Sequence, residues 1–466
     1  MITAKTNLSK KGDIMSELVV GLLGFACIIA IVVTLFRSMM LPSIAFIVFP
    51  LALAVILVTG GYYTWDDIAS LIKSGFSSTG PTAALFVFSV LYFGIMTDAG
   101  LFDVIISKLM KLVGDSVLGV CIMTCIIALI GHLDGGGAST FCIVIPAMLP
   151  VYKRMHMRPT TLLRISVIAM GVLNLMPWAG PTMRATTVLG MEAGSLWSTL
   201  LPIQICGIIL AFGVAAINGL IETKRGAGLN GRLAQTEGVV TLAEAEGEGS
   251  NNNELARPKL FVFNLLLTIA VIALLIKDIF PSYVPFMIGV SIAIIVNYHG
   301  AKMQKKIINL HAGPALMMCS TLMGAAVLMG ILVKDVEGTT SVIACMSDLI
   351  SSNLPAVLGR HLPLVIGILS VPLALAFDTD SYFYGMLPVM IGVGEGFGIP
   401  ALPIAIAMVV CRNCATFISP MVPATLLGVG LADVDIKDHI KSTFLWVWCF
   451  SLVCMIFAIM TGIIPF

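Results

Sequence analysis

Charged residues are scarce in this chain, and long polar stretches are nearly absent. Of its 466 residues 11% are charged and 58% are hydrophobic. A soluble domain cannot keep that many apolar side chains away from water. The composition therefore excludes a soluble protein and predicts an all-α integral membrane protein with many spanning helices. A net charge of +1 also argues against nucleic acid as a partner.

Motifs for several enzyme classes are missing as well. The sequence has no Walker A pattern, no HExxH and no GxSxG, and the Gly-rich run at 392–396 lacks the Lys-Ser/Thr pair of a phosphate loop. The 11 cysteines are scattered through apolar runs, which favours small buried side chains over a disulfide framework. The sequence therefore predicts neither an enzyme nor a tightly bound cofactor, and transport would draw on an ion gradient.

A polar, glycine-rich stretch at residues 129–141 separates two short apolar runs, 117–130 and 142–151. Each run is shorter than the roughly 20 residues that a spanning helix needs. Two short arms with a polar tip predict a re-entrant hairpin at about residues 115–152, which enters the membrane and returns to the same side. The alternative is a polar loop between two short spanning helices. A second pair of short runs predicts another hairpin at about residues 362–394.

Ten further apolar segments predict spanning helices in two sets of five. The first set is 15–36, 40–60, 81–97, 161–189 and 200–220; the second set is 260–280, 284–298, 315–333, 401–427 and 444–464. Prolines inside the fourth segment of each set predict a broken helix there. Matching motifs recur about 240 residues apart, which indicates an internal repeat. Because each copy has an odd number of spanning helices, the second copy is predicted to be inverted.

These segments divide the chain into four parts. We expect an N-terminal extension at 1–14, a first inverted repeat at 15–221, a flexible linker at 222–258 and a second inverted repeat at 259–466. The first apolar run lacks a cleavage site, which favours a retained helix over a removed signal.

Basic residues in the short loops predict the orientation in the cytoplasmic (inner) membrane. They place the linker in the cytoplasm and both termini outside. The loop cations are Lys108, Lys111, Lys153, Arg154, Arg158, Arg164, Lys302, Lys305 and Lys306. Lys5, Lys10 and Lys11 disagree with this orientation, because they would be exported.

Four polar clusters fall in the hairpin tips and the broken helices. The first tip carries His132, Asp134, Gly135, Gly136, Gly137, Ser139 and Thr140, and the first break carries Asn174, Pro177, Pro181, Thr182 and Arg184. The second tip carries Asp378, Asp380 and Ser381, and the second break carries Arg412, Asn413, Thr416, Ser419 and Thr425. In secondary transporters such breaks meet at a substrate site near the bilayer midplane. Free amides at half-helix N-termini would favour an anion there.

The charges in these clusters have both signs. Arg184 and Arg412 suit a carboxylate, because a guanidinium binds it with two parallel hydrogen bonds. The groups that suit a hard cation or a proton are Asp134, Asp378, Asp380 and His132. A substrate that is itself a metal–carboxylate complex would satisfy both signs in one cavity. The alternative is that the acids and arginines pair with one another as structural ion pairs.

The motifs at 133–140, 174–184, 377–385 and 419–425 resemble the signatures of the citrate–metal:proton symporters of the ion transporter superfamily. The resemblance spans nearly the whole chain, although Gly136 stands where family members often have a second acid. It implies import of citrate, or a similar di- or tricarboxylate, complexed with a divalent cation such as Mg²⁺ or Ca²⁺ and coupled to protons. It also implies a homodimer in which a transport domain moves across the membrane as an elevator.

The resulting predicted substrate-binding residues are Gly135, Gly136, Gly137, Ser139, Thr140, Pro181, Thr182, Arg184, Ser381, Arg412, Asn413, Ser419 and Thr425. Three alternatives remain open from the sequence. They are a symporter of a metal-free carboxylate such as gluconate, the membrane subunit of a decarboxylase ion pump, and an ion antiporter without an organic substrate.

Overall fold

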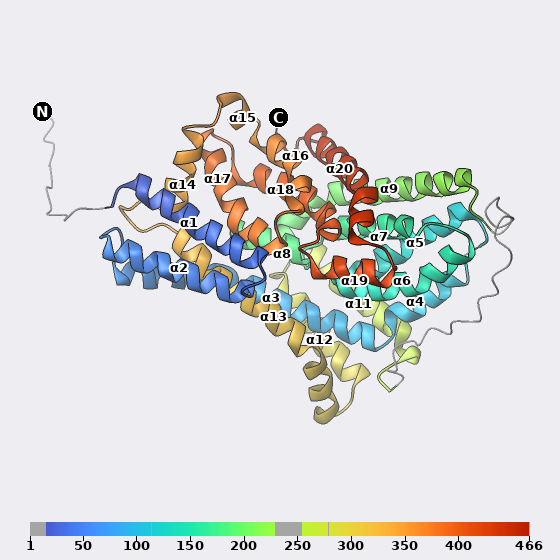
Figure 1. Ribbon diagram of the computed structural model, residues 1–466. Helices are drawn as coiled ribbons and strands as arrows, with labels where there is room; N and C mark the ends of the chain where they lie inside the picture. Colours follow the sequence, from blue (N-terminus) through green and yellow to red (C-terminus); the bar gives the residue numbers. More distant parts are fainter. Residues whose placement is uncertain (1–14, 113, 229–253, 278, 466) are drawn as a thin grey trace, which may run out of the picture.

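The computed structural model describes residues 15–112, 114–228, 254–277 and 279–465. These residues fold into helices and turns, with an isolated β-bridge between Val336 and Thr339. The predicted N-terminal extension at 1–14 and the centre of the predicted linker, 229–253, lie outside them. The all-helical membrane fold expected from the composition is confirmed (Figure 1).

The two halves of the chain place their helices in the same order. The first half forms α1 (Glu17–Phe36), α2 (Pro42–Thr59), α3 (Trp65–Asp98), α4 (Leu101–Met110), α5 (Val117–Gly131), η1 (His132–Asp134), α6 (Gly137–Arg154), α7 (Pro159–Leu173), α8 (Gly180–Leu189) and α9 (Ala193–Arg225). The second half forms η2 (Pro258–Leu260), α11 (Phe261–Ile276), α12 (Tyr283–Asn297), α13 (Ala301–Val333), α14 (Val342–Ser351), α15 (Ala356–Arg360), α16 (Leu362–Ala374), the π-helix η3 (Ser381–Met386), α17 (Leu387–Gly396), α18 (Ala401–Cys414), η4 (Thr416–Ile418), α19 (Pro423–Leu431) and α20 (Ile436–Met460). Each half thus has a long third helix, a hairpin and a broken helix.

The long helices α3 and α13 begin earlier than the sequence predicted. They were expected to start at 81 and 315, beside Pro81 and Pro314, but both helices run through these prolines. The start of α3 is fixed by a capping box, in which the Thr64 hydroxyl accepts from the backbone N–H of Asp67 at 3.2 Å. A proline inside a membrane helix is tolerated where neighbouring groups satisfy the freed backbone. Pro81 and Pro314 therefore do not mark the starts of these two helices.

The two repeats are interlocked along these long helices. Helix α3 packs along α13, while α2 packs on α13 and α12 packs on α3. Glycines permit the contact, because a Cβ on Gly75 would lie 2.0 Å from the Ala326 carbonyl oxygen and one on Gly330 would lie 2.5 Å from that of Leu71. Each half therefore completes its packing on the long helix of the other half.

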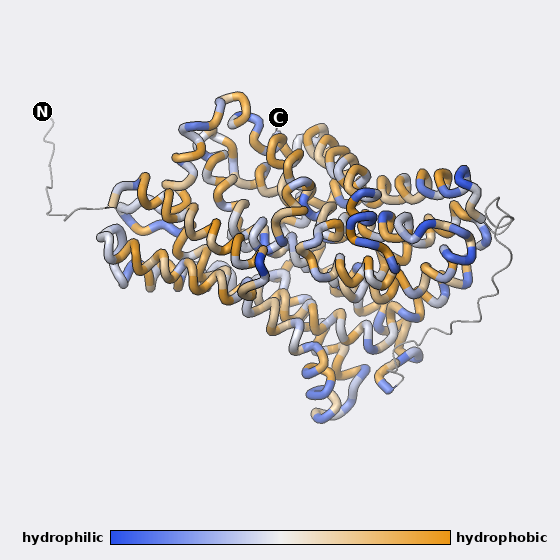
Figure 2. The backbone as a smooth tube through the Cα atoms, in the orientation of Figure 1, coloured by the Kyte–Doolittle hydropathy of each residue, from blue (hydrophilic) through white to orange (hydrophobic). Residues whose placement is uncertain are grey.

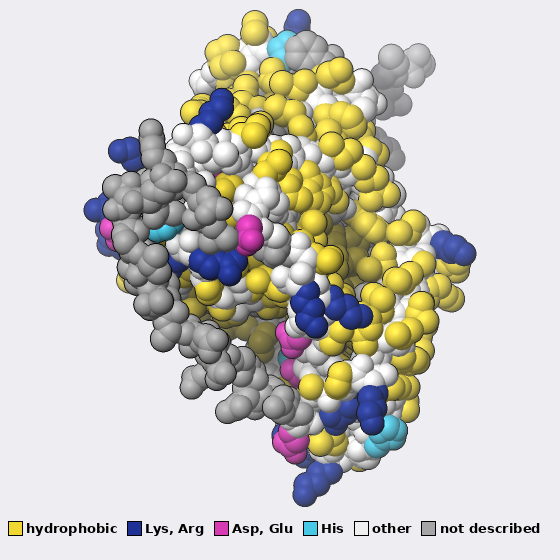
Figure 3. All heavy atoms as spheres, turned by 90° about the vertical axis from the view of Figure 1, so that its right-hand side faces the viewer, with side chains coloured by type: hydrophobic (Ala, Val, Ile, Leu, Met, Phe, Trp, Pro, Cys, Tyr) yellow, Lys and Arg dark blue, Asp and Glu magenta, His cyan; other side chains and the backbone are white. Residues whose placement is uncertain are grey.

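By length and composition, 8 helical segments within the described ranges can cross a membrane. The arm 117–134 of the first hairpin is one of them. Helices α7, α12 and α18 fall short of the required length, and for α7 and α18 the reason is the predicted break that ends them. In Figure 2 hydrophobic residues run along most helices, and hydrophilic residues gather at the right-hand helix ends and the lower tip. Figure 3 views the side of the molecule that lies to the right in Figure 1, and Lys and Arg side chains are spread over this side.

The predicted start of the linker at 222 is wrong, because α9 continues to Arg225. The backbone N–H of Gly228 donates to the Met155 carbonyl at 2.8 Å, and at the other end that of Arg257 donates to Ala99 at 3.0 Å. The charge of Glu222 suggested a solvated segment, yet its carboxylate is fully buried. The charge of Glu222 therefore did not indicate a solvent-exposed position.

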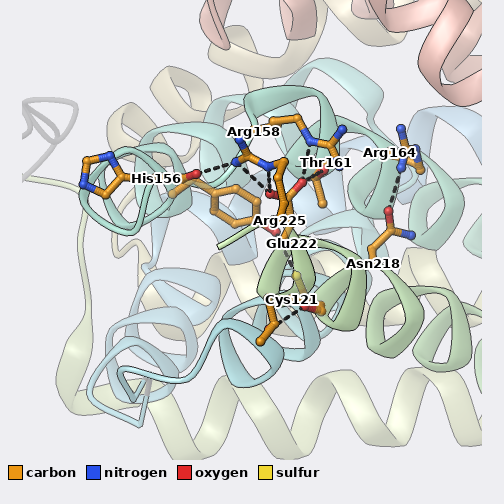
Figure 4. Close-up of polar contacts among 11 residues, drawn as sticks. Cys121, His156, Arg158, Thr161, Arg164, Asn218, Glu222 and Arg225 are labelled. Atoms are coloured by element: carbon orange, nitrogen blue, oxygen red, sulfur yellow. Dashed lines mark hydrogen bonds and ion pairs between the residues drawn. The ribbon is translucent and has the colours of Figure 1, made fainter. Parts of the chain in front are cut away.

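Glu222 joins the end of α9 to the start of α7 (Figure 4). Its carboxylate accepts from Arg158 Nε at 2.6 Å and from Thr161 Oγ1 at 2.7 Å, and Arg225 Nη2 lies 2.9 Å from it. The side chain of Arg225 also donates to the His156 carbonyl at 2.5 Å. These contacts hold the first broken helix against α9.

Arg164 was predicted to be a loop cation, but it lies in α7 and is 6% exposed. Its Nη1 donates to Asn218 at 2.6 Å (Figure 4). Its guanidinium lies 5.2 Å from the ring centre of Trp446. Arg164 therefore contributes to helix packing and carries no information on orientation.

Candidate functional site

The first hairpin, α5–η1–α6, ends in a tip that its own acid holds together. The Asp134 carboxylate accepts from the Gly136 N–H at 2.8 Å and from the Ser139 hydroxyl. Gly135 turns the chain with φ of 71°, a conformation that a side chain disfavours. A Cβ on Gly137 would lie 2.3 Å from the Phe417 ring, so this glycine seats the tip against the second break. Gly135 thus forms the turn of this tip, and Gly137 allows the tip to pack against Phe417.

The second hairpin, α16–η3–α17, repeats this arrangement with different residues. The Asp378 carboxylate accepts from the Asp380 N–H at 2.9 Å and from the Ser381 hydroxyl. The arm that follows begins as the π-helix η3, a form often found beside functional sites. Asp134 and Asp378 therefore occupy equivalent positions, and each caps the tip of its own hairpin.

The two breaks meet beside the first tip. The backbone carbonyl of Asn174, at the end of α7, accepts from Thr182 Oγ1 at 2.5 Å and from Asn413 Nδ2 at 2.9 Å. Asn413 lies 239 residues further along the chain, in the last turn of α18. Close helix contact comes from Gly171, whose Cβ would lie 2.9 Å from the Cα of Cys414. The meeting of the two breaks thus places one asparagine from each half of the chain side by side.

His132 joins the first tip to this meeting point. Its Nδ1 lies 2.7 Å from Thr140 Oγ1, and its Nε2 lies 3.1 Å from Asn174 Oδ1. The ring is fully buried and packs edge-on against Phe417 at 5.3 Å. His132 therefore contacts the tip and both breaks.

The two arginines of the predicted site have different partners. Arg184 Nε lies 2.5 Å from Asp380 Oδ1, and both side chains are nearly buried. Arg412 is fully buried but forms no ion pair with any described residue; Nη2 donates to the Phe377 carbonyl at 3.2 Å and Nη1 to Thr416 at 3.4 Å. The structural ion-pair alternative therefore holds for Arg184 and Asp380. Arg412 has no ion-pair partner within the described ranges, and its guanidinium lies 5.6 Å from the ring centre of Tyr382.

Four buried polar atoms at the two breaks have no hydrogen-bond partner among the residues that the structure describes. They are Asn174 Nδ2, Arg412 Nε, Asn413 Oδ1 and Thr425 Oγ1. An unsatisfied buried donor or acceptor costs about 1–3 kcal/mol, so such groups are rare unless a ligand or water completes them. Two donors, one acceptor and one hydroxyl suit a ligand that carries both carboxylate oxygens and electropositive atoms.

The predicted acid cluster is not assembled in this structure. No three His, Cys, Asp or Glu side chains in the described ranges are placed to hold a metal ion. Asp134 and Asp378 bind their own tips, and Asp380 binds Arg184. The described residues therefore do not assemble these three acids and His132 into a metal site, and their alternative role as proton carriers stays a prediction.

Other predicted residues shape the backbone around the site. Pro181 lies in the first turn of α8, and Ser419 accepts from the Met421 N–H at 3.2 Å. Sequence reasoning omitted Asn174 from the binding set, and it gave no role to Trp178, whose Nε1 donates to the Leu133 carbonyl at 2.8 Å. The available signal for Asn174 was its position at the end of α7, directly before the first break.

Replacing Arg184 by Ala is expected to destabilise the protein by about 3 kcal/mol, because Asp380 would be left buried and unpaired. The double variant Arg184→Ala, Asp380→Ala should recover most of that loss. Thermal unfolding in detergent measures both variants. Equal stability of the single and the double variant would show that the pair does not contribute as an ion pair.

Comparison with known proteins identifies the family. The family model CitMHS, described as a citrate transporter, matches residues 25–411. The chain belongs to this citrate transporter family. It is 35% identical over 446 residues to a Bacillus subtilis (strain 168) protein named "Citrate transporter", which covers 96% of this chain and 100% of the relative. It is 31% identical over 448 residues to the "Mg(2+)/citrate complex secondary transporter" of the same organism, covering 95% of this chain and 99% of the relative.

The fold of this citrate transporter family member also has a solved counterpart. The crystal structure of the Alcanivorax borkumensis YdaH transporter, described as having an unusual topology, superimposes with a TM-score of 0.56 and covers 84% of this chain and 89% of that chain at 13% identity. The predicted family resemblance is confirmed, and so is the prediction of a transporter rather than an enzyme. The alternative of a decarboxylase pump subunit is set aside by the family.

Proposed function

We propose that this citrate transporter family member imports citrate, or a similar di- or tricarboxylate, as a complex with a divalent cation. The observation that carries the proposal is Arg412, a fully buried guanidinium without an acidic partner in the described parts of the chain. Burying an unpaired charge is costly, and a bound carboxylate would neutralise it with strong hydrogen bonds. The relative named for a Mg²⁺–citrate complex supports the choice of substrate.

The cation in this proposal enters with the substrate. Citrate has three carboxylates, and a divalent cation on it lowers the charge that must leave water. The described residues offer no cluster of three ligands for a metal site of the protein's own. The same observation favours the second candidate, import of a metal-free carboxylate, and uptake assays with and without metal separate the two.

We further propose a proton-coupled elevator mechanism in a homodimer of the cytoplasmic membrane. The interlocked helices α2, α3, α12 and α13 would form the scaffold, and the hairpins with the broken helices would carry the substrate. The residues between α9 and η2 would lie in the cytoplasm, and both termini outside. The helix order of the two repeats supports this division.

Radiolabelled citrate uptake into proteoliposomes with an inward proton gradient tests the function. We expect uptake with Mg²⁺ or a similar cation to exceed uptake in a chelator by at least about tenfold, and a protonophore to abolish it. Empty liposomes provide the background. Uptake that is highest in the chelator would establish the metal-free candidate, and no uptake under any condition would reject citrate as the substrate.

A further inference from the structure

A basic groove lies where α12 ends and α13 begins, at the hydrophilic lower tip in Figure 2. It has a volume of about 790 Å³, and its lining includes Lys302, Lys305 and Lys306. Lys306 Nζ lies 3.1 Å from the Glu254 carboxylate, whereas Lys302 and Lys305 form no ion pair with any residue in the described ranges. Three lysines and one glutamate leave the groove with an excess of positive charge, which suits an anionic ligand.

The face of α13 that carries the lysines continues as an exposed apolar track. By helical spacing, the residues that share this face with Lys302 and Lys306 are Leu310, Gly313 and Met317, and these three form the apolar track. Leu310 is 50% exposed and Met317 is 56% exposed. A Cβ on Gly313 would meet no atom within 4 Å, so the space between the two apolar side chains is open.

The length of this face matches one leaflet of a bilayer. From Lys306 to Met317 the helix rises about 16 Å, at roughly 1.5 Å per residue. The hydrocarbon core of a bilayer is roughly 30 Å thick, so the acyl chains of one leaflet span about half of that. A phospholipid has its phosphate at one end of its acyl chains. Lysines at one end of an apolar face of this length therefore match both parts of such a molecule.

We propose that the groove binds an anionic phospholipid, with the phosphate at Lys302 and Lys305 and an acyl chain along the apolar track. The lysines select an anionic headgroup, because the ammonium group of a zwitterionic lipid would meet charges of its own sign. A second copy of the chain fits less well, since a two-fold interface pairs a surface patch with itself and would bring the lysines of both copies together. Because α13 packs on α2 and α3, a lipid bound here would fix the depth of the interlocked helices in the bilayer.

Native mass spectrometry of the delipidated full-length protein in detergent tests the site. We expect the first phosphatidylglycerol to bind at least about tenfold more tightly than the first phosphatidylcholine, since each lysine near an anionic headgroup favours binding about fivefold. In the double variant Lys302→Gln, Lys305→Gln this preference should fall below about threefold. The matched control is Lys437→Gln, Lys441→Gln, which removes the same charge from exposed positions at the start of α20, beside Asp438, and should keep the preference.

Three results would overturn the proposal. The first is equal binding of the two lipids by the wild type, or an unchanged preference in Lys302→Gln, Lys305→Gln. The second is binding of glycerol phosphate, which lacks acyl chains, as tight as that of phosphatidylglycerol, because the site would then take a soluble anion. The third is a lower oligomeric mass of this double variant, which would make the groove a contact between copies. Without lipid both double variants should unfold at the wild-type temperature, since exposed charges contribute little to stability, so a lost preference reports on binding.

Discussion

Arg412→Gln is expected to lower citrate uptake about 100-fold or more. The guanidinium is fully buried and has only the Phe377 carbonyl and the Thr416 hydroxyl as hydrogen-bond partners within the described structure. Removing one partner of a buried charge pair costs roughly 2–5 kcal/mol of binding, and 1.4 kcal/mol corresponds to a factor of ten. Concentration-dependent uptake in proteoliposomes measures the loss.

The stability of the empty protein distinguishes binding from folding. A buried charge without an acidic partner is unfavourable when no substrate is bound, so Arg412→Gln should unfold at the same temperature as the wild type or higher. Stabilisation by added citrate should disappear. Arg154→Gln is the matched control, because Arg154 is 57% exposed and lies 3.9 Å from Asp115. Uptake by Arg412→Gln within threefold of wild type would remove Arg412 from the site.

The contrast between the two arginines explains why the sequence predicted the site only in outline. Arg184 and Arg412 both lie beside a predicted helix break, and both were predicted to bind a carboxylate. Only the fold brings Asp380, 196 residues away, to Arg184. Pairing between distant residues depends on how the hairpins dock, and local sequence carries no measure of that.

The architecture was predictable because its signals are periodic and repeated. Prolines at the breaks, glycines at the first tip and the repeat of about 240 residues located the hairpins and the broken helices. The predicted helix boundaries were wrong where polar residues lie inside helices. Helix α3 begins at Trp65, within a segment that holds Asp66, Asp67 and Lys73, and α9 continues through Glu222. Length and packing overrode local polarity in both places.

His311 is a second example, outside the candidate site, of a contact between distant residues that the sequence does not indicate. His311 lies within α13 with Nε2 2.9 Å from the Asp98 carboxylate. Its ring occupies the space beside Gly94, where a Cβ would lie 2.5 Å from it. The pair links the two long helices, and its partners are 213 residues apart in the chain.

Glu222→Gln should lower the stability of the protein by about 3 kcal/mol, because Arg158 and Arg225 would lose the carboxylate between them. The two arginines are 41% and 34% exposed and can turn partly to water, which keeps the loss below that of a fully buried pair. Because α7 leads directly to the first break, uptake should fall together with stability. Thermal unfolding in detergent measures the change.

The matched control for this variant is Glu254→Gln. Glu254 is 73% exposed and pairs with Lys306 at 3.1 Å, so the same substitution there should cost less than about 1 kcal/mol. A Glu222→Gln protein as stable as Glu254→Gln would mean that the hydrogen bonds of Thr161, rather than the charge of Glu222, hold α7 against α9. A large loss confined to Glu222→Gln would identify the buried carboxylate as the link that fixes the first broken helix to the end of its own repeat.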